Sequence, residues 1–336
     1  MSIAGRTESP RIGIVLPVKL SLFVNETKRV DRAVDQVVDA EARGFHAAWM
    51  PQIAGFDAMT VLALAATKTE RIRLGTSVVP TWPRHPVAIA QQALTVSQLS
   101  DGRFDLGIGT SHVPVIEGSY GIPFERPIRH IAEYVQIVKS LATTGAVNFV
   151  GEQYRVAAGV AIPDERMPVM VSVLSEQMTR TAGRYADGGI TWLAPPSYIA
   201  STIVPLIRKG ADAAGREPPP VVCQVPATAE ADAEAVRKTV RRLFGIYPML
   251  PFYNAMMQKA GLPGAADALT AGWNDDLIDA VIPYGGEEAL GARVAEYLEA
   301  GADEVVYAPF PVGGDWKASL TLTLDAMTQI AGHPQP

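Results

Sequence analysis

Short apolar runs alternate with longer segments of helical period along almost the whole chain. The apolar runs are bounded by glycine or proline, and the segments between them repeat apolar residues every three to four positions. The predicted strands cover residues 11–17, 47–52, 72–80, 104–111, 168–174, 189–194, 220–227 and 303–309. The predicted helices cover residues 29–44, 57–69, 86–101, 176–186, 198–214, 229–262 (with a break near Pro248), 287–300 and 318–331.

This strict alternation favours a closed (β/α)8 TIM barrel of the α/β class over a doubly wound open sheet, because right-handed crossovers close naturally at eight strands. The alternation pauses once, after the fourth predicted strand, where a loop rich in glycine and proline precedes a helix at about 129–143 and a hairpin at 147–156. We therefore expect residues 1–336 to form a single domain with an insertion at about 112–165.

Composition and charge narrow the class of ligand. Hydrophobic residues make up 48% of the chain and charged residues 19%, which is typical of a globular protein with a large core. The formal net charge is −6, and the chain has no dense run of lysine or arginine. These features argue against nucleic acid or an anionic membrane as the main partner, so a small molecule is the expected ligand.

The cell compartment is predicted from cysteine usage and from the N-terminal residues. Cys223 is the single cysteine and lies in a predicted strand, where a buried, unreactive thiol is expected. Residues 1–10 are polar and lack the apolar centre of a signal peptide. Both observations fit a reducing cytoplasm.

The strand ends, where a barrel of this type carries its active site, are poor in the groups that hydrolases use. They offer no pair of carboxylates for glycoside hydrolysis, and the chain has no Gly-x-Ser-x-Gly elbow. The five histidines lack the spacing of metal ligands, so no metal is expected. A pocket of small and aromatic residues suits a bound organic cofactor that performs redox chemistry.

Two segments indicate where such a cofactor would lie. Gly107 and Gly109 end the fourth predicted strand, where missing side chains would admit a flat ligand, and the imidazole of His112 follows directly. At Ser175 the fifth strand meets its helix, whose free N–H groups can hold a phosphate. Ser175 can equally be an ordinary N-cap, and spacing alone leaves both readings open.

Four motifs together resemble the luciferase-like monooxygenase superfamily, and in particular its branch that uses the deazaflavin coenzyme F420. They are Leu-Gly-Thr-Ser-Val-Val-Pro at 74–80, Asp-Gly-Arg-Phe-x-Leu-Gly-Ile-Gly at 101–109, Ala-Gly-Arg-x-Ala-Asp-Gly at 182–188 and Ala-Gly-Ala-Asp-Glu-Val at 300–305. The resemblance spans about residues 11–310, and residues 112–130 resemble a mycobacterial-type subgroup of these reductases.

The resemblance implies a non-proline cis peptide bond between Ser77 and Val78 that supports the back of the deazaflavin ring. It places the coenzyme on Ser77, Val78, Gly109, Thr110, Leu174, Ser175, Glu176, Gln177 and Met178, the last five around the phosphate. Many relatives have glycine and proline where this chain has Ser175 and Glu176. A carboxylate beside a phosphate is repulsive unless it turns to solvent.

The resemblance also identifies Gln52 and His112 as candidate catalytic residues. In the sugar-phosphate dehydrogenase branch these positions hold a histidine and a glutamate that transfer protons, so that substrate is not expected here. His112 can hold or move a proton while a hydride moves at the deazaflavin C5 carbon, or it can simply bind the ring or the insertion loop. The expected pocket is apolar, suits a ketone, an activated alkene or an electron-poor ring, and is edged by Trp82, Tyr120, Trp192 and Phe310.

The sequence therefore predicts an F420-dependent oxidoreductase that transfers a hydride between the deazaflavin and a small organic acceptor. An FMN-dependent monooxygenase of the same fold is one alternative, and a non-catalytic flavin or deazaflavin carrier is another. The apolar segment 249–257 and the resemblance indicate a homodimer, although an apolar helix can also fill a core.

Overall fold

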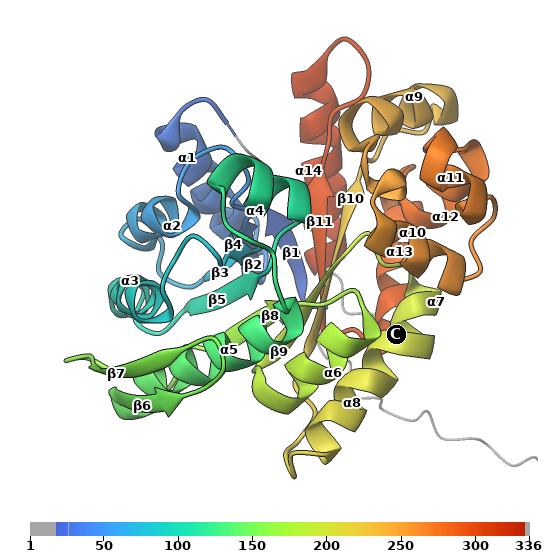
Figure 1. Ribbon diagram of the computed structural model, residues 1–336. Coiled ribbons are helices and arrows are strands. Elements are labelled where there is room, and N and C mark those ends of the chain that lie inside the picture. The colour runs from blue at the N-terminus through green and yellow to red at the C-terminus, as the bar shows by residue number, and fades with distance from the viewer. Residues whose placement is uncertain (1–17, 26, 333–336) are drawn as a thin grey trace, which may run out of the picture.

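The computed structural model describes residues 18–25 and 27–332 and contains a closed parallel barrel surrounded by helices (Figure 1). The sheet order is β3-β2-β1-β11-β10-β9-β8-β5-β4, and a further pairing between β3 and β5 closes it. The strands are β1 (Leu20–Phe23), β2 (Ala47–Met50), β3 (Arg73–Thr76), β4 (Val79–Pro80), β5 (Phe104–Gly109), β8 (Val169–Ser172), β9 (Gly188–Trp192), β10 (Val221–Ala227) and β11 (Glu304–Pro309). Since β3 and β4 are two halves of one strand position, the predicted (β/α)8 barrel is confirmed.

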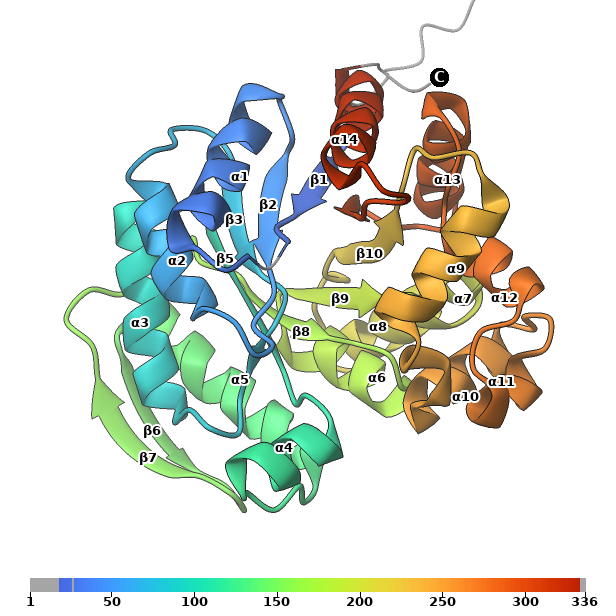
Figure 2. The same cartoon turned by 90° about the horizontal axis from the view of Figure 1, so that it is seen from above.

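Helices cover the outside of the barrel, as the view from above shows (Figure 2). They include α1 (Val30–Ala42), α2 (Ala58–Ala66), α3 (Pro86–Leu99), α6 (Glu176–Tyr185), α7 (Pro196–Tyr198), α8 (Val204–Asp212), α9 (Ala233–Phe244), α13 (Glu287–Glu299) and α14 (Trp316–Gly332). A π-helical turn, Ile199–Ile203, joins α7 to α8, so this part forms the one long helix that was predicted. The strand predicted at 11–17 lies outside the described residues, and β1 begins after it.

The insertion between β5 and β8 carries the predicted long helix and hairpin. They are α5 (Pro127–Thr144) and the antiparallel strands β6 (Ala146–Val150) and β7 (Arg155–Gly159). The prediction of a loop before α5 was partly wrong, because α4 (Val113–Tyr120) forms there. Pro114 is tolerated in its first turn, and Gly121 ends it in the left-handed conformation at φ 66°.

The segment after α9 is more divided than predicted. A 3-10 turn, Tyr247–Met249, leads into α10 (Pro251–Lys259), and α11 (Ala265–Ala271) and α12 (Asp275–Val281) follow. The last two helices have seven residues each, too short to show a clear period in the sequence. They depend on tertiary contacts, such as the hydrogen bond that Asn254 Nδ2 donates to the carbonyl oxygen of Ala265 at 2.7 Å.

An apolar layer fills the barrel interior, with Trp49 as its largest member. A Cβ on Gly75 would lie 2.3 Å from the Trp49 ring, so the glycine gives that ring its space. The layer consists of Ala47, Trp49, Met170, Ile190, Val222 and Val306, with Phe23 and Val78 packed against it. It separates the two ends of the barrel.

Below this layer, at the N-terminal ends of the strands, lies a buried carboxyl group. Glu304 is 7% exposed, and its Oε1 accepts a hydrogen bond of 2.6 Å from the indole N–H of Trp49. Burial raises the pKa of Glu304 to about 7. His46, whose Nε2 lies 4.0 Å from Glu304 Oε2, has a pKa that burial lowers to about 4. Both groups are therefore largely neutral between these two values.

We predict that Glu304→Gln stabilises the protein at alkaline pH. The pKa of Glu304 is higher in the folded protein than in the unfolded chain, so its contribution to stability is full below about pH 4.5 and is lost as the pH rises through 7. Glutamine still accepts from Trp49 but cannot ionise. The variant should gain about 1–3 kcal/mol in free energy of unfolding at pH 8 and almost nothing near pH 4.5, as measured by urea denaturation. An equal gain at both pH values would contradict this assignment.

Candidate active site

The third strand of the barrel is interrupted at its C-terminal end by a cis peptide bond between Ser77 and Val78, as the resemblance implied. The chain is held on both sides of this bond. The Ser77 N–H donates to the carbonyl of Met50 in β2 at 2.8 Å, and the Thr76 hydroxyl bonds with both backbone groups of Gly107 in β5. After the bond, β4 returns to pair with the end of β5.

The two glycines of β5 make room for the interrupted third strand. A Cβ on Gly107 would lie 1.9 Å from the carbonyl oxygen of Thr76, and one on Gly109 would lie 2.4 Å from Ser172 Oγ and 2.7 Å from a methyl group of Val78. The prediction that these glycines leave open space for a flat ligand was therefore wrong. They let neighbouring strands approach, and in doing so they help to set the position of Val78.

A hydrogen bond between side chains crosses the barrel at the level of the cis bond. The Ser77 hydroxyl donates to Oε1 of Gln224 in β10, which stands opposite β3 in the closed sheet. Gln224 is 2% exposed, and its Nε2 has no hydrogen-bond partner among the described residues. Sequence analysis missed Gln224, although an amide inside an otherwise apolar predicted strand was a usable signal.

His112 follows β5 through a sharp turn. Thr110 is buried, and Ser111 has the left-handed backbone conformation, with φ 59°, that directs the chain into α4. The His112 ring lies 6.0 Å from the ring of Tyr253 in α10, measured between centroids. Burial lowers the pKa of His112, so the imidazole is neutral at physiological pH and can either donate or accept a proton.

An aromatic row extends from Tyr253 across the ends of the strands. Tyr253 contacts Tyr247 at 5.0 Å between centroids, Tyr247 lies 6.1 Å from Trp192, and Trp192 stacks on Phe23 at 5.2 Å. Two more rings extend the row: Phe244 beside Trp192 and Phe310 beside Phe244. The row carries no charged side chain. Trp192 and Phe310, both predicted to edge the pocket, therefore belong to one apolar wall.

The other two predicted pocket residues lie elsewhere. Trp82 stacks on His130 of α5, with centroids 3.7 Å apart, and so belongs to the packing of the insertion. Tyr120 lies on α4 and is 44% exposed. His130 bonds through Nε2 to the Thr81 hydroxyl at 2.8 Å, and burial lowers the pKa of His130 to about 4. Its imidazole is thus a neutral support for the loop after β4.

Gln52, the second catalytic candidate, follows β2. Its Oε1 accepts from the backbone N–H of Ala58 at 3.2 Å, at the start of α2. This bond holds Gln52 to α2, while the ring of His112 faces α10. The catalytic role of Gln52 stays a prediction.

The start of α6 carries the residues expected around a phosphate. Ser175 is the N-cap, and its hydroxyl accepts from the N–H of Met178 at 3.3 Å. Glu176 is paired with Arg180 at 3.0 Å and also with Lys259 of α10, which is the main cause of its lowered pKa. One carboxylate and two cations leave a net charge of +1 at this helix start. These two cations therefore compensate the Glu176 carboxylate.

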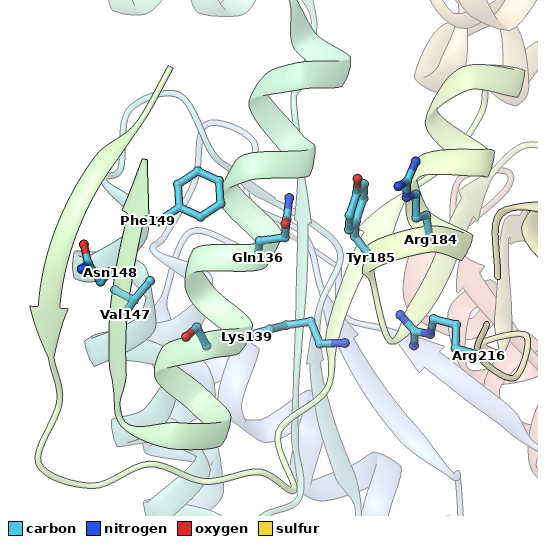
Figure 3. A pocket seen from close by; sticks show the side chains of 9 residues that line it. Gln136, Lys139, Val147, Asn148, Phe149, Arg184, Tyr185 and Arg216 are labelled. Atoms are coloured by element: carbon cyan, nitrogen blue, oxygen red, sulfur yellow. The ribbon is translucent and has the colours of Figure 1, made fainter. Parts of the chain in front are cut away.

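A cavity of about 440 Å³ lies away from these residues, beside α5, β6 and the C-terminal end of α6 (Figure 3). Lys139 and Arg216 both pair with Asp187, and the Arg184 guanidinium lies 5.2 Å from the centre of the Tyr185 ring. The lining residues are Gln136, Lys139, Ser140, Val147, Asn148, Phe149, Arg184, Tyr185 and Arg216. None of them is a predicted site residue.

The part of the chain that the structure describes offers neither a metal-binding cluster nor a membrane-spanning helix. Within residues 18–25 and 27–332, no group of three histidine, cysteine, aspartate or glutamate side chains is arranged to hold a metal ion. Over the same residues, no helix combines the length and apolar character needed to cross a bilayer.

Comparison with known proteins agrees with the predicted resemblance. A putative coenzyme F420-dependent oxidoreductase of Mycobacterium tuberculosis is 42% identical over 120 residues, 35% of each chain. An F420-dependent secondary alcohol dehydrogenase, solved with an F420–acetone adduct, superposes with a TM-score of 0.77 at 19% identity, covering 93% of this chain and 98% of that one. A type II Baeyer–Villiger monooxygenase of Pseudomonas putida, solved with FMN, has a TM-score of 0.73 at 16% identity and covers 95% and 98%.

At these identities the two solved structures show the fold alone. The family comparison is broader, since the sequence profile described as luciferase-like monooxygenase matches residues 11–304. That span includes the interrupted third strand, the glycines of β5 and the capped start of α6. The chain belongs to the luciferase-like monooxygenase family.

Proposed function

We propose that the protein is an F420-dependent oxidoreductase that transfers a hydride between the deazaflavin C5 carbon and a small organic acceptor. The observation that carries this proposal is the buried, half-bonded amide of Gln224, which lies across the barrel from Ser77 and bonds with its hydroxyl. The similarity to proteins named as F420-dependent supports it. When bound, F420 supplies two-electron hydride chemistry, and the protein supplies binding, orientation and electrostatics.

The residues proposed to hold the coenzyme form two groups. Ser77, Val78, Gly109 and Thr110 lie at the ends of β3, β4 and β5 and would hold the ring. The second group, Leu174 with Ser175, Glu176, Gln177 and Met178, would hold the phosphate at the start of α6. Lys259 and Arg180 compensate Glu176 there, so an anion meets a net positive charge and the positive end of the helix dipole.

His112 is proposed to act on the acceptor. Its lowered pKa keeps the imidazole neutral, so its ring N–H can donate a hydrogen bond to the oxygen of the acceptor, and its other nitrogen can take the proton of an alcohol when the hydride moves to the coenzyme. Gln52 follows β2, two strand positions away from β5, and is proposed to orient the same substrate through its amide.

The aromatic row favours an uncharged acceptor. Phe23, Trp192, Tyr247 and Tyr253 offer flat apolar surfaces and no cation to pair with a sugar phosphate. We therefore propose a ketone, an activated alkene or an electron-poor ring as the acceptor class.

The remaining proposals concern compartment and assembly. We propose a cytoplasmic enzyme, for which the buried free thiol of Cys223 is the supporting observation.

The side chains of segment 249–257 differ in their exposure to solvent. Tyr253, Met256 and Met257 are buried, whereas Met249 and Phe252 are 47% and 58% exposed.

We predict a homodimer that buries these exposed side chains, and light scattering of the purified protein tests it. A mass near 36 kDa at micromolar concentration would contradict the dimer. Phe252→Ser should shift the mass toward the monomer, whereas Leu64→Ser, at an exposed position on α2, should not.

The FMN-dependent monooxygenase remains the second candidate, because an FMN-binding protein shares the fold. Titration with F420 and with FMN, followed by tryptophan fluorescence, separates the two. We predict saturation by F420 at micromolar concentration and weaker binding of FMN. Saturation by FMN alone would favour the monooxygenase.

A single-turnover experiment on the same complex tests the acceptor and excludes a carrier. We predict that cyclohexenone reoxidises bound reduced F420, and that glucose 6-phosphate does not reduce bound F420. Turnover of the sugar phosphate in preference to the enone would contradict the proposed acceptor class. A complex that no acceptor reoxidises would indicate a carrier.

We predict that His112→Ala lowers kcat about 10²- to 10⁴-fold while the Kd for F420 changes less than about twofold, because the proton transfer is lost and the coenzyme contacts remain. His85→Ala is the matched control, since His85 accepts from the N–H of Val87 at the start of α3 and its ring lies against Tyr154 of the insertion. In the wild type, because burial lowers the pKa of His112, kcat should fall at acid pH only below the range in which a free imidazole titrates. Equal losses in kcat and in affinity would make His112 a binding residue.

A further inference from the structure

Gln224 is a polar residue at the upper boundary of the apolar barrel interior. In β10 it is paired with Trp192 of β9 on one side and with Val306 of β11 on the other. Its carbonyl oxygen accepts from the N–H of Leu193 at 3.0 Å. Backbone pairing on both sides therefore fixes its Cα, and only the side-chain torsions remain free.

The side-chain amide of Gln224 is only half satisfied. Its Oε1 accepts from the Ser77 hydroxyl, whereas no described residue accepts from Nε2. An amide donor left unbonded at 2% exposure costs about 1–3 kcal/mol, so such groups are rare without a ligand or water to bind them. The neighbouring interior side chains, Trp49, Ile190 and Val222, are apolar and buried.

The bond to Ser77 links this free donor to the proposed coenzyme site. Ser77 forms one half of the cis peptide bond, so the amide of Gln224 lies at the same level of the barrel as the proposed ring support. The pyrimidine part of a deazaflavin presents carbonyl oxygens and a ring nitrogen that accept hydrogen bonds.

We propose that Nε2 of Gln224 donates a hydrogen bond to an acceptor atom on the pyrimidine ring of bound F420. This inference rests on the proposed function. A donor at this edge stabilises the electron-rich reduced ring more than the oxidised ring, so Gln224 both holds the coenzyme and raises its tendency to accept a hydride. Ser77 orients the amide by occupying Oε1.

Two variants of nearly the same side-chain size distinguish a loss of coenzyme binding from a loss of packing at position 224. Gln224→Met removes both polar atoms, and Gln224→Glu keeps an acceptor for Ser77 but replaces the donor with a carboxylate oxygen. Affinities for oxidised and for reduced F420 are measured by fluorescence titration. Gln136→Met is the control, because Gln136 lies on α5 in the cavity away from the site.

We expect Gln224→Met to weaken binding of reduced F420 about 3- to 10-fold, with a smaller loss for oxidised F420. Gln224→Glu should lose more, because a carboxylate then faces an electron-rich ring. Without coenzyme, Gln224→Met should melt close to the wild-type temperature, since it removes an unbonded buried donor but also the acceptor of the Ser77 hydroxyl. The rise in Tm on adding F420 should be smaller than in the wild type.

The outcomes separate this inference from the proposed function. A wild type that binds no F420 overturns both. A wild type that binds F420, with both variants within twofold of it, overturns only the role of Gln224. If Gln224→Glu binds as well as the wild type while Gln224→Met does not, the amide is turned the other way and presents an acceptor, which also overturns the donor role.

Discussion

The arrangement of the site depends on how the third barrel strand is interrupted and then resumed. A parallel barrel closes only if every strand pairs on both sides, yet β3 and β4 are separated by a cis bond. The Thr76 hydroxyl takes over backbone bonding to β5 at the break, and Ser77 reaches across to Gln224. These contacts keep the barrel closed while the backbone of residues 77 and 78 is displaced from regular pairing.

The apolar interior layer divides the barrel into two chemically different ends. At one end Glu304, His46, Asp105 and Arg73 form a set of ionisable groups with shifted pKa values, set mainly by burial and, for Arg73, by its bond to Asp105. At the other end the charged groups are paired, Arg84 with Asp57 and Glu176 with Arg180 and Lys259, and the site residues described above are aromatic rings, amides, hydroxyls and a neutral imidazole. Surroundings with few unpaired charges suit hydride transfer, because a few directed hydrogen bonds then set how readily a redox ring accepts a hydride. Trp49 joins the interior layer to the ionisable end of the barrel, since its ring lies in the layer and its indole N–H donates to Glu304.

Helix α10 connects two parts of the site that are far apart in the sequence. Its Tyr253 contacts His112 after β5, and its Lys259 pairs with Glu176 at the start of α6. The helix thus completes the aromatic row and also compensates the Glu176 carboxylate. The proposed acceptor site and the proposed phosphate site are therefore joined by one helix outside the barrel.

The sequence by itself determined the barrel, since short apolar runs alternating with amphipathic segments reflect local backbone preference and burial. It also determined the capped start of α6, because Ser175 and Met178 lie within one short motif, whereas the cis bond at Ser77–Val78 was implied only by the resemblance to a known family. Only the tertiary structure decided the purpose of Gly107 and Gly109, the pairing of Glu176 with Lys259 and the half-bonded state of Gln224. These depend on distances between residues separated by dozens of positions or more, and such distances are set by how the strands close and how the helices pack, not by local pattern.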